Sequence, residues 1–241
     1  MINHLGGSVP IELGSLTKLV GLYFGQNNLR GKLLSSLGNF TSLKFLGVAS
    51  NNIEGDIPDD IARLTQIVDL ELSMNNLSCV FPPAIYNLSL EDLSISFNSF
   101  FGSLRPDFGN LVPNTRFLYL EGNYFTGAIP KTPPNISNLQ VVAMEYNKLI
   151  GSIPSSFGKV RNLQLLELYH NSLGSHSSGD HEFLEYLTNC TKLRTLSVAE
   201  NRLGGGGDLP TSIANLSVNL IHLSLGKTTS LETFLMTLGI S

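Results

Sequence analysis

Asparagine recurs along this chain at nearly constant intervals, and apolar side chains recur with it. Intervals of 24, 24, 23, 25, 24, 24 and 30 residues separate Asn27, Asn51, Asn75, Asn98, Asn123, Asn147, Asn171 and Asn201. The residues eight, five and three places before each asparagine are apolar in every copy except one, in which Thr115 stands in the first of these places. A fixed period of this length indicates a chain built from stacked repeats.

Positions within a copy are numbered here from its first apolar residue, so that positions 1, 4 and 6 are apolar and position 9 is asparagine. The alternation around positions 4 and 6 predicts a short strand with one inward and one outward face. A single such strand buries too little surface, so neighbouring copies must stack into a parallel sheet over a shared core. We expect the asparagine amides, which both donate and accept hydrogen bonds, to join successive coils. The sequence thus predicts an α/β solenoid, a horseshoe with a parallel sheet of short strands on its concave face.

The repeat divides the chain into three regions. Residues 1–18 form a partial first repeat without a cap, residues 19–219 hold eight repeats, and residues 220–241 hold a last strand and a divergent tail. We place that last strand between Leu220 and Leu225, after which the asparagine ladder stops.

Two segments outside the strand pattern predict helices. The long, irregular copy at residues 163–192 contains a short helix for which Asp180 is a suitable N-cap, with one apolar face made by Phe183, Leu184 and Leu187. In the tail, residues 230–238 have helical apolar spacing, and Thr229 and Glu232 are spaced as a capping box. This second helix would cover the final coil.

Beyond the asparagine, most copies continue with a second motif, N-x-L-x-G-x-I-P. Residues 51–58 read NNIEGDIP and residues 147–154 read NKLIGSIP. Together with the L-x-x-L-x-L-x-x-N template, this motif resembles the ectodomains of plant leucine-rich-repeat receptor kinases and receptor-like proteins over residues 3–227. Residues 180–193 and 209–217 are similar to the cereal immune-receptor subgroup of that family.

The resemblance implies a function as well as a leucine-rich-repeat horseshoe. It implies a non-catalytic recognition module that binds a peptide or protein on its concave face, with a co-receptor as a further partner, in defence or signalling. It also implies a parent protein at the extracellular face of the plasma membrane or secreted. Plant polygalacturonase inhibitors share this repeat type, so a secreted inhibitor of a cell-wall-degrading enzyme is an alternative. A truncated product without independent function is another.

Outward positions 5, 7 and 8 form columns on the sheet, with about 4.8 Å between strands. In the coils from Asn98 onward these columns carry aromatic side chains interleaved with carboxylates. Exposed aromatic residues on a rigid sheet are good contact anchors, and carboxylates favour a partner that bears Arg or Lys. We therefore predict a ligand-binding set of Phe97, Tyr119, Glu121, Glu145, Tyr146, Glu167, Tyr169 and His170.

Composition narrows the classes of partner. Charged residues make up only 14% of the chain and the net charge is −4, with no basic stripe to neutralise phosphates, so nucleic acid is not expected. We find neither a secretory signal nor a run of about 18 apolar residues that would span a membrane. Two cysteines, Cys79 and Cys190, lie several coils apart and are interpreted as small buried apolar groups rather than a disulfide.

No catalytic, cofactor or metal site is expected. His170, His176, His181 and Asp180 lie near one another in sequence, but their spacing matches no standard ligand motif. Glutamates on adjacent strands could form an acid/base pair, yet an open sheet offers no enclosed pocket for glycosidase chemistry. Protein-kinase signatures are absent from the sequence. The chain is predicted not to be an enzyme.

Six Asn-x-Ser/Thr sequons permit an extracellular assignment. They begin at Asn39, Asn76, Asn87, Asn135, Asn189 and Asn215.

Overall fold

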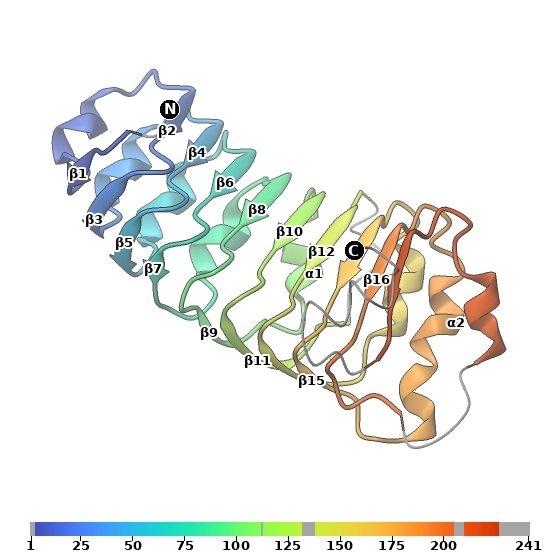
Figure 1. The fold of residues 1–241 in the computed structure, drawn as a ribbon. Coiled ribbons are helices and arrows are strands. Elements are labelled where there is room, and N and C mark those ends of the chain that lie inside the picture. Colours follow the sequence, from blue (N-terminus) through green and yellow to red (C-terminus); the bar gives the residue numbers. More distant parts are fainter. Residues whose placement is uncertain (1–2, 112, 132–137, 205–209, 227–241) are drawn as a thin grey trace.

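The computed structural model describes residues 3–111, 113–131, 138–204 and 210–226. These residues wind into coils stacked along one axis (Figure 1). Each coil contributes one strand to a parallel sheet whose spatial order follows the chain order. Equal repeat positions are paired across the sheet, as in Leu22 with Leu46 and Leu70 with Leu93. The nine strands of this sheet are β2 (Gly21–Tyr23), β4 (Phe45–Gly47), β6 (Asp69–Glu71), β8 (Asp92–Ser94), β10 (Phe117–Tyr119), β12 (Val141–Ala143), β14 (Leu165–Glu167), β16 (Thr195–Ser197) and β17 (His222–Ser224).

Two smaller parallel sheets flank the main one, formed by the x-L-x-G part of the second motif. The first comprises β1 (Gly6–Gly7), β3 (Asn28–Lys32), β5 (Asn52–Gly55) and β7 (Asn76–Leu77). The second comprises β9 (Phe101–Ser103), β11 (Tyr124–Ala128), β13 (Lys148–Gly151) and β15 (Ser172–Leu173).

The break between the two flanking sheets falls at Cys79, which stands in the glycine slot of the repeat. The matching glycines Gly55 and Gly102 have φ values of 79° and 81°, a conformation that a residue with a Cβ adopts only at a cost. Cys79 is not in that conformation. On this side of the solenoid β7 does not pair with β9, and the two coils are joined instead by the isolated bridge Val80 to Phe101 and by hydrogen bonds such as Phe101 N to Cys79 O at 3.0 Å. Cys79 is also only partly buried, so the expectation of full burial holds for Cys190 alone.

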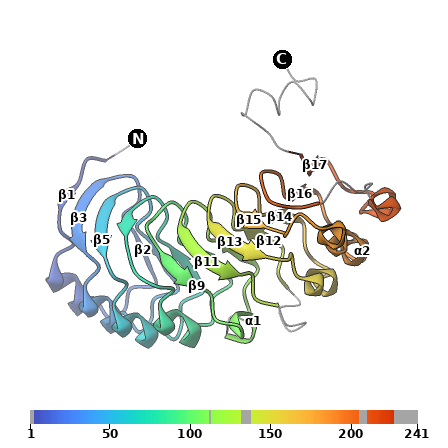
Figure 2. The same cartoon turned by 90° about the horizontal axis from the view of Figure 1, so that it is seen from below.

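Short helices form the side of the solenoid away from the main sheet (Figure 2). Most are single 3-10 turns that begin after the proline slot, where the backbone is extended. Leu34, which replaces that proline in one coil, has φ −89° and ψ 142° and begins its helix as the prolines do. The helices are η1 (Ile11–Ser15), η2 (Ser35–Asn39), η3 (Asp59–Arg63), η4 (Pro83–Asn87), α1 (Phe108–Leu111), η5 (Ser155–Lys159), η6 (Ser178–His181), α2 (Phe183–Leu187) and η7 (Thr211–Asn215).

The asparagine ladder joins each coil to the one before it, as predicted. Asn51 shows the pattern. Its Oδ1 accepts a hydrogen bond from Leu29 N at 3.0 Å, and its Nδ2 donates to Phe24 O and Val48 O at 2.9 Å. The same side chain therefore closes its own turn and binds the backbone of the preceding coil. Equivalent bonds from the preceding coil reach Oδ1 of Asn27, Asn75, Asn98, Asn123, Asn147, Asn171 and Asn201.

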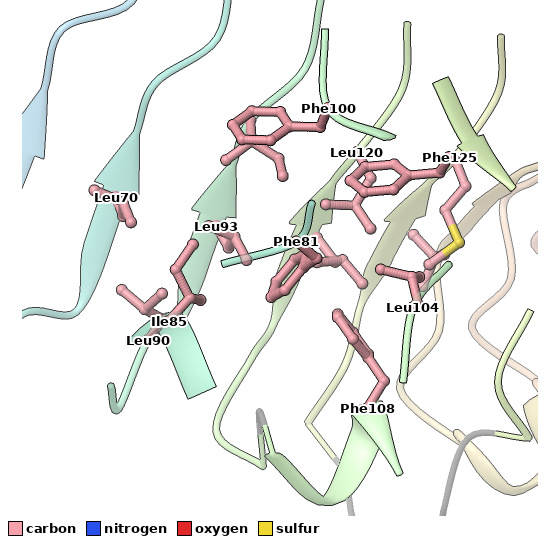
Figure 3. Close-up of a cluster of buried hydrophobic side chains, with 14 of the residues drawn as sticks. Leu70, Phe81, Ile85, Leu90, Leu93, Phe100, Leu104, Phe108, Leu120 and Phe125 are labelled. Atoms are coloured by element: carbon pink, nitrogen blue, oxygen red, sulfur yellow. The ribbon is translucent and has the colours of Figure 1, made fainter. Parts of the chain in front are cut away.

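Apolar side chains at positions 1, 4 and 6 fill one continuous core between the main sheet and the helices. In the middle coils the core becomes aromatic, and Figure 3 shows Phe81, Phe100, Phe108 and Phe125 close together. The rings of Phe100 and Phe125 stack at 6.3 Å, and those of Phe81 and Phe108 meet edge to face at 5.1 Å. Thr115, the polar exception at position 1, is fully buried and its hydroxyl donates to Leu90 O at 3.3 Å.

The long coil contains the predicted helix, with a different cap. Phe183, Leu184 and Leu187 of α2 are buried, as the sequence predicted. Asp180 is not the N-cap. Ser177 caps η6, and Asp180 stands three residues later and bonds back to the Ser177 backbone N–H at 3.0 Å. This reciprocal pair explains why a carboxylate occurs there. The predicted tail helix lies outside the described residues.

Replacing Asn51 by Ala is expected to destabilise the fold. The substitution leaves the buried Leu29 N–H without its acceptor and removes the link to the preceding coil. We expect the free energy of unfolding, measured by urea titration, to fall by about 2 kcal/mol. Asn52 is the matched control, because it is the next residue in the chain and its side chain is exposed. An equal effect of Asn52→Ala would contradict the role of the ladder.

Candidate functional site

The residues predicted to contact a ligand lie on the outward face of the main sheet. Backbone hydrogen bonds continue the strand register beyond position 5, as in Leu120 N to Ala143 O and Gly122 N to Glu145 O. Positions 5, 7 and 8 of successive coils therefore stand side by side in columns. The eight predicted contact residues come from four consecutive coils.

Position 8 has a backbone conformation that the sequence pattern did not indicate. In each of eight coils the residue before asparagine has φ between 50° and 65°. Left-handed conformations are uncommon for residues other than glycine, and they cluster at functional or tightly constrained sites. Three predicted contact residues, Phe97, Tyr146 and His170, are held in this way. The full set is Gln26, Ser50, Met74, Phe97, Gly122, Tyr146, His170 and Glu200.

An aromatic cluster, consisting of Tyr146, Tyr169 and His170, forms the best-defined part of this face. The Tyr146 ring meets the Tyr169 ring edge to face at 5.0 Å and the His170 ring at 4.8 Å. His170 Nδ1 is hydrogen-bonded to Glu200 Oε2 at 2.6 Å, across to the next coil. Tyr146 is 46% exposed, and His170 is also exposed, so ring surface remains available for contact.

Phe97 stands at position 8 two coils before Tyr146, and its ring lies against Gly122 of the coil between them. It is 51% exposed, and a Cβ at Gly122 would lie 2.5 Å from its ring. The glycine thus leaves room for the phenyl ring to lie flat on the next coil. Phe97 is an exposed ring with a fixed backbone, as a contact anchor requires.

The three predicted carboxylates differ in exposure. Glu121 and Glu167 are half-buried, whereas Glu145 is only 7% exposed. Burial raises the pKa of Glu145 to about 8, and repulsion from Glu167 and Glu121 adds to the shift. Glu145 is therefore largely withdrawn from solvent, and its raised pKa favours the protonated form at neutral pH. Its position between Glu121 and Tyr169, in a dense column of large side chains, removes it from water.

The sequence analysis missed a second group of carboxylates at position 3. Asp69 and Asp92 are directly paired on β6 and β8, and Glu71 is two residues from Asp69. Burial raises the pKa of Asp92 to about 6, with further contributions from Asp69 and Glu71. Position 3 faces outward by the same alternation as position 5, so the sequence pattern was sufficient to predict these outward-facing acids. These acids extend the acidic face toward the N-terminal coils.

The three histidines His170, His176 and His181 and the nearby Asp180 are not arranged as a metal site. Asp180 accepts hydrogen bonds from the backbone N–H groups of Ser175 and Ser177. Burial alone would raise its pKa, but these bonds lower it to about 2. Among the described residues, no group of three His, Cys, Asp or Glu side chains is arranged to hold a metal ion.

The described sequons lie away from the main sheet. Asn39, Asn189 and Asn215 are exposed at or after the ends of short helices, and Asn76 is exposed in the flanking strand β7. Asn135 lies outside the described residues, as does the side chain of Asn87.

Comparison with known proteins agrees with the fold. Residues 42–64 and 89–111 match the Leucine Rich Repeat family model. A receptor-like protein kinase of Arabidopsis thaliana is 56% identical over 122 residues, which are 51% of this chain and 12% of that protein. The leucine-rich-repeat ectodomain of the Arabidopsis receptor kinase GASSHO1/SCHENGEN3, solved with CASPARIAN STRIP INTEGRITY FACTOR 2, covers 92% of this chain with a TM-score of 0.83 and 30% identity. The match spans 26% of that chain.

A second solved structure is the Arabidopsis receptor kinase HAESA in complex with the peptide hormone IDA and the co-receptor SERK1. It has a TM-score of 0.76 and 27% identity, and the match covers 83% of this chain and 33% of that one. The stacked coils and the repeat matches define a leucine-rich-repeat protein. In sequence the chain is similar to plant receptor-like kinases, and the match spans 12% of the length of the Arabidopsis kinase. Across the described ranges, no helix is long and apolar enough to cross a bilayer.

Replacing Glu145 by Gln is expected to change how stability depends on pH. The folded chain holds the Glu145 proton up to about pH 8, whereas an ordinary glutamate releases it near 4.5. The folded state therefore binds more protons than the unfolded state in this window, and stability falls as pH rises through it. Between pH 6 and pH 8, the free energy of unfolding should fall by about 2 kcal/mol more in the natural protein than in Glu145→Gln.

The measurement is urea unfolding at both pH values. Glu185→Gln serves as control, because Glu185 is exposed on α2. It should retain the pH dependence of the natural protein. Parallel pH profiles for the natural protein and Glu145→Gln would show that Glu145 ionises as an ordinary surface glutamate.

Proposed function

We propose that this chain is a non-catalytic recognition module that binds a peptide or protein ligand on the outward face of its main sheet. The observation that carries the proposal is the exposure of Phe97, and of Tyr146 within the aromatic cluster, on one face of the main sheet. Rings of this kind bury large area at small cost in side-chain entropy, and they dominate many interfaces. The ligand would lie across the strands, along the columns of positions 5, 7 and 8.

Rigidity of the scaffold supports this proposal. Every strand beneath the contact residues is fixed to its neighbour by backbone hydrogen bonds and by an asparagine side chain, such as Asn147 or Asn171. A preorganised surface loses little conformational freedom on binding, so more of the contact energy appears as affinity. The Tyr146 and Tyr169 rings also restrain each other through their edge-to-face contact.

The distribution of sequons also favours the sheet face. Asn39, Asn189 and Asn215 are at the helical side and Asn76 is on a flanking sheet. Glycans at these positions would cover those sides and leave the columns of the main sheet accessible. A partner of protein size would then find one broad face without attached sugar.

The relatives supply the biological setting. HAESA was solved with a peptide hormone and a co-receptor, and by analogy we propose a peptide ligand and a co-receptor for the parent of this chain. We place that parent at the extracellular face of the plasma membrane or in secreted form, acting in signalling or defence. The half-buried Glu121 and Glu167 favour a ligand with basic residues, since like charges would be repelled.

A random dodecapeptide library displayed on phage provides a test that does not require the natural ligand. Peptides enriched on the full chain should bind through the aromatic cluster. We expect the double substitution Tyr146→Ala with Tyr169→Ala to weaken their affinity at least about thirtyfold, because central tyrosines act as anchors. Fluorescence anisotropy with labelled synthetic peptides measures the effect.

The chain offers a matched control pair. Tyr124 and Tyr186 are 50% and 47% exposed, but they lie on a flanking strand and on α2. Replacing both by Ala should leave the affinity within about twofold of the natural protein. If the library yields no binders, or if binding depends on the control pair instead, the sheet face is not the ligand site.

A further inference from the structure

Two neighbouring glutamates on the main sheet carry buried oxygens without a hydrogen-bond partner in the described part of the chain. Glu121 and Glu145 occupy position 7 of consecutive coils, joined by the bond from Gly122 N to Glu145 O. Oε2 of each side chain is buried, and among the described residues neither oxygen accepts a hydrogen bond. We name these two residues the glutamate pair. Adjacent strands are about 4.8 Å apart, so the two carboxyl groups stand next to each other.

The glutamate pair is costly for the fold. A buried acceptor without a donor loses its hydration and gains nothing in return. Burial raises the pKa of both glutamates, and the charge of Glu121 raises the pKa of Glu145 further. Ser96, buried one coil earlier in the same column, lowers the pKa of Glu121 but does not reach Glu145. The two Oε2 atoms are therefore available to accept hydrogen bonds from a donor group of a ligand.

Within the described ranges, no basic side chain supplies that donor. The ion pairs of the described residues involve Glu91, Glu200 and two aspartates, but neither member of the glutamate pair. The groups that face Glu145 are acidic or aromatic. They are Glu121 from the preceding coil, and Glu167 and Tyr169 from the following coil.

The side chains around the glutamate pair indicate which kind of ligand group would bind there. A metal ion would need three or more ligating groups, and no such set exists in the described part of the chain. A guanidinium group carries five N–H donors in a planar fork that matches carboxylates, and it stacks on aromatic rings. Tyr119, Tyr146 and Tyr169 stand around the pair, so both the acceptors and the rings are present.

We infer that the glutamate pair is the subsite for one arginine side chain of the ligand. The inference rests on the proposed function, because it assigns one residue of a peptide that lies along the sheet. The arginine would pass between the tyrosine rings and donate to Glu121 and Glu145 together. Both carboxylates are ionised in the complex, and the charge of the guanidinium replaces the proton that Glu145 holds in the free protein.

Binding is thereby coupled to proton release. Free Glu145 is mostly protonated below its pKa of about 8, whereas arginine remains charged at every relevant pH. A lower pH therefore favours the free protein, and a higher pH favours the complex. Acidification would release an arginine-bearing ligand, and a rise toward pH 8 would retain it.

Fluorescently labelled hexa-arginine peptide is the probe, with hexa-citrulline as its uncharged counterpart of similar shape. Anisotropy titrations at pH 8 compare the full natural chain with two double variants that each remove two negative charges. Glu121→Gln with Glu145→Gln should weaken hexa-arginine binding at least about tenfold. Glu54→Gln with Glu185→Gln, at exposed sites on β5 and α2, should change it less than about twofold. Hexa-citrulline should bind at least about tenfold more weakly than hexa-arginine.

A pH series on the natural chain gives a second readout that does not depend on how the variants fold. Between pH 6 and pH 8 the affinity for hexa-arginine should rise at least about tenfold, and in the Glu121→Gln, Glu145→Gln variant this rise should disappear. Equal weakening by the two double variants, or a flat pH profile of the natural chain, would overturn the subsite. The library test with the tyrosine variants remains informative in that case, since selected peptides without arginine can still bind the aromatic cluster.

Discussion

The hydrogen bonds between an asparagine side chain and the backbone of the preceding coil are the constraint on which the rest of this structure depends. Each such amide closes a turn of its own coil and, at the same time, accepts a backbone N–H from the coil before it. The spacing of the repeat, the three-residue strands and the left-handed residue at position 8 all follow from keeping this asparagine in place.

A scaffold fixed in this way brings together side chains that are about 24 residues apart in sequence. That arrangement allows local concentrations of one kind of group, such as the paired Asp69 and Asp92 or the neighbouring Glu121 and Glu145. In a less rigid fold these carboxylates would move apart into water. Here the core and the ladder hold them, and the cost appears as raised pKa values on the face that we assign to ligand binding.

Departures from the repeat are absorbed locally, because each coil contacts only its neighbours. Cys79 interrupts a flanking sheet without disturbing the main one. Thr115 occupies an apolar place by bonding to Leu90 O. The long coil at residues 163–192 replaces one 3-10 turn by η6 and α2, while its strand β14 stays in register with β12 and β16. Variation in such coils can therefore change a surface without changing the fold.

The sequence alone determined the period, the inward positions and the asparagine ladder, since these depend on the alternation of apolar and polar residues within one coil. It also indicated the aromatic cluster of Tyr146, Tyr169 and His170 and the buried face of α2. Only the tertiary structure decided that Glu145 is buried and that Asp69 pairs with Asp92. Burial and pairing depend on side chains from adjacent coils, and a local pattern does not record how those side chains pack against one another.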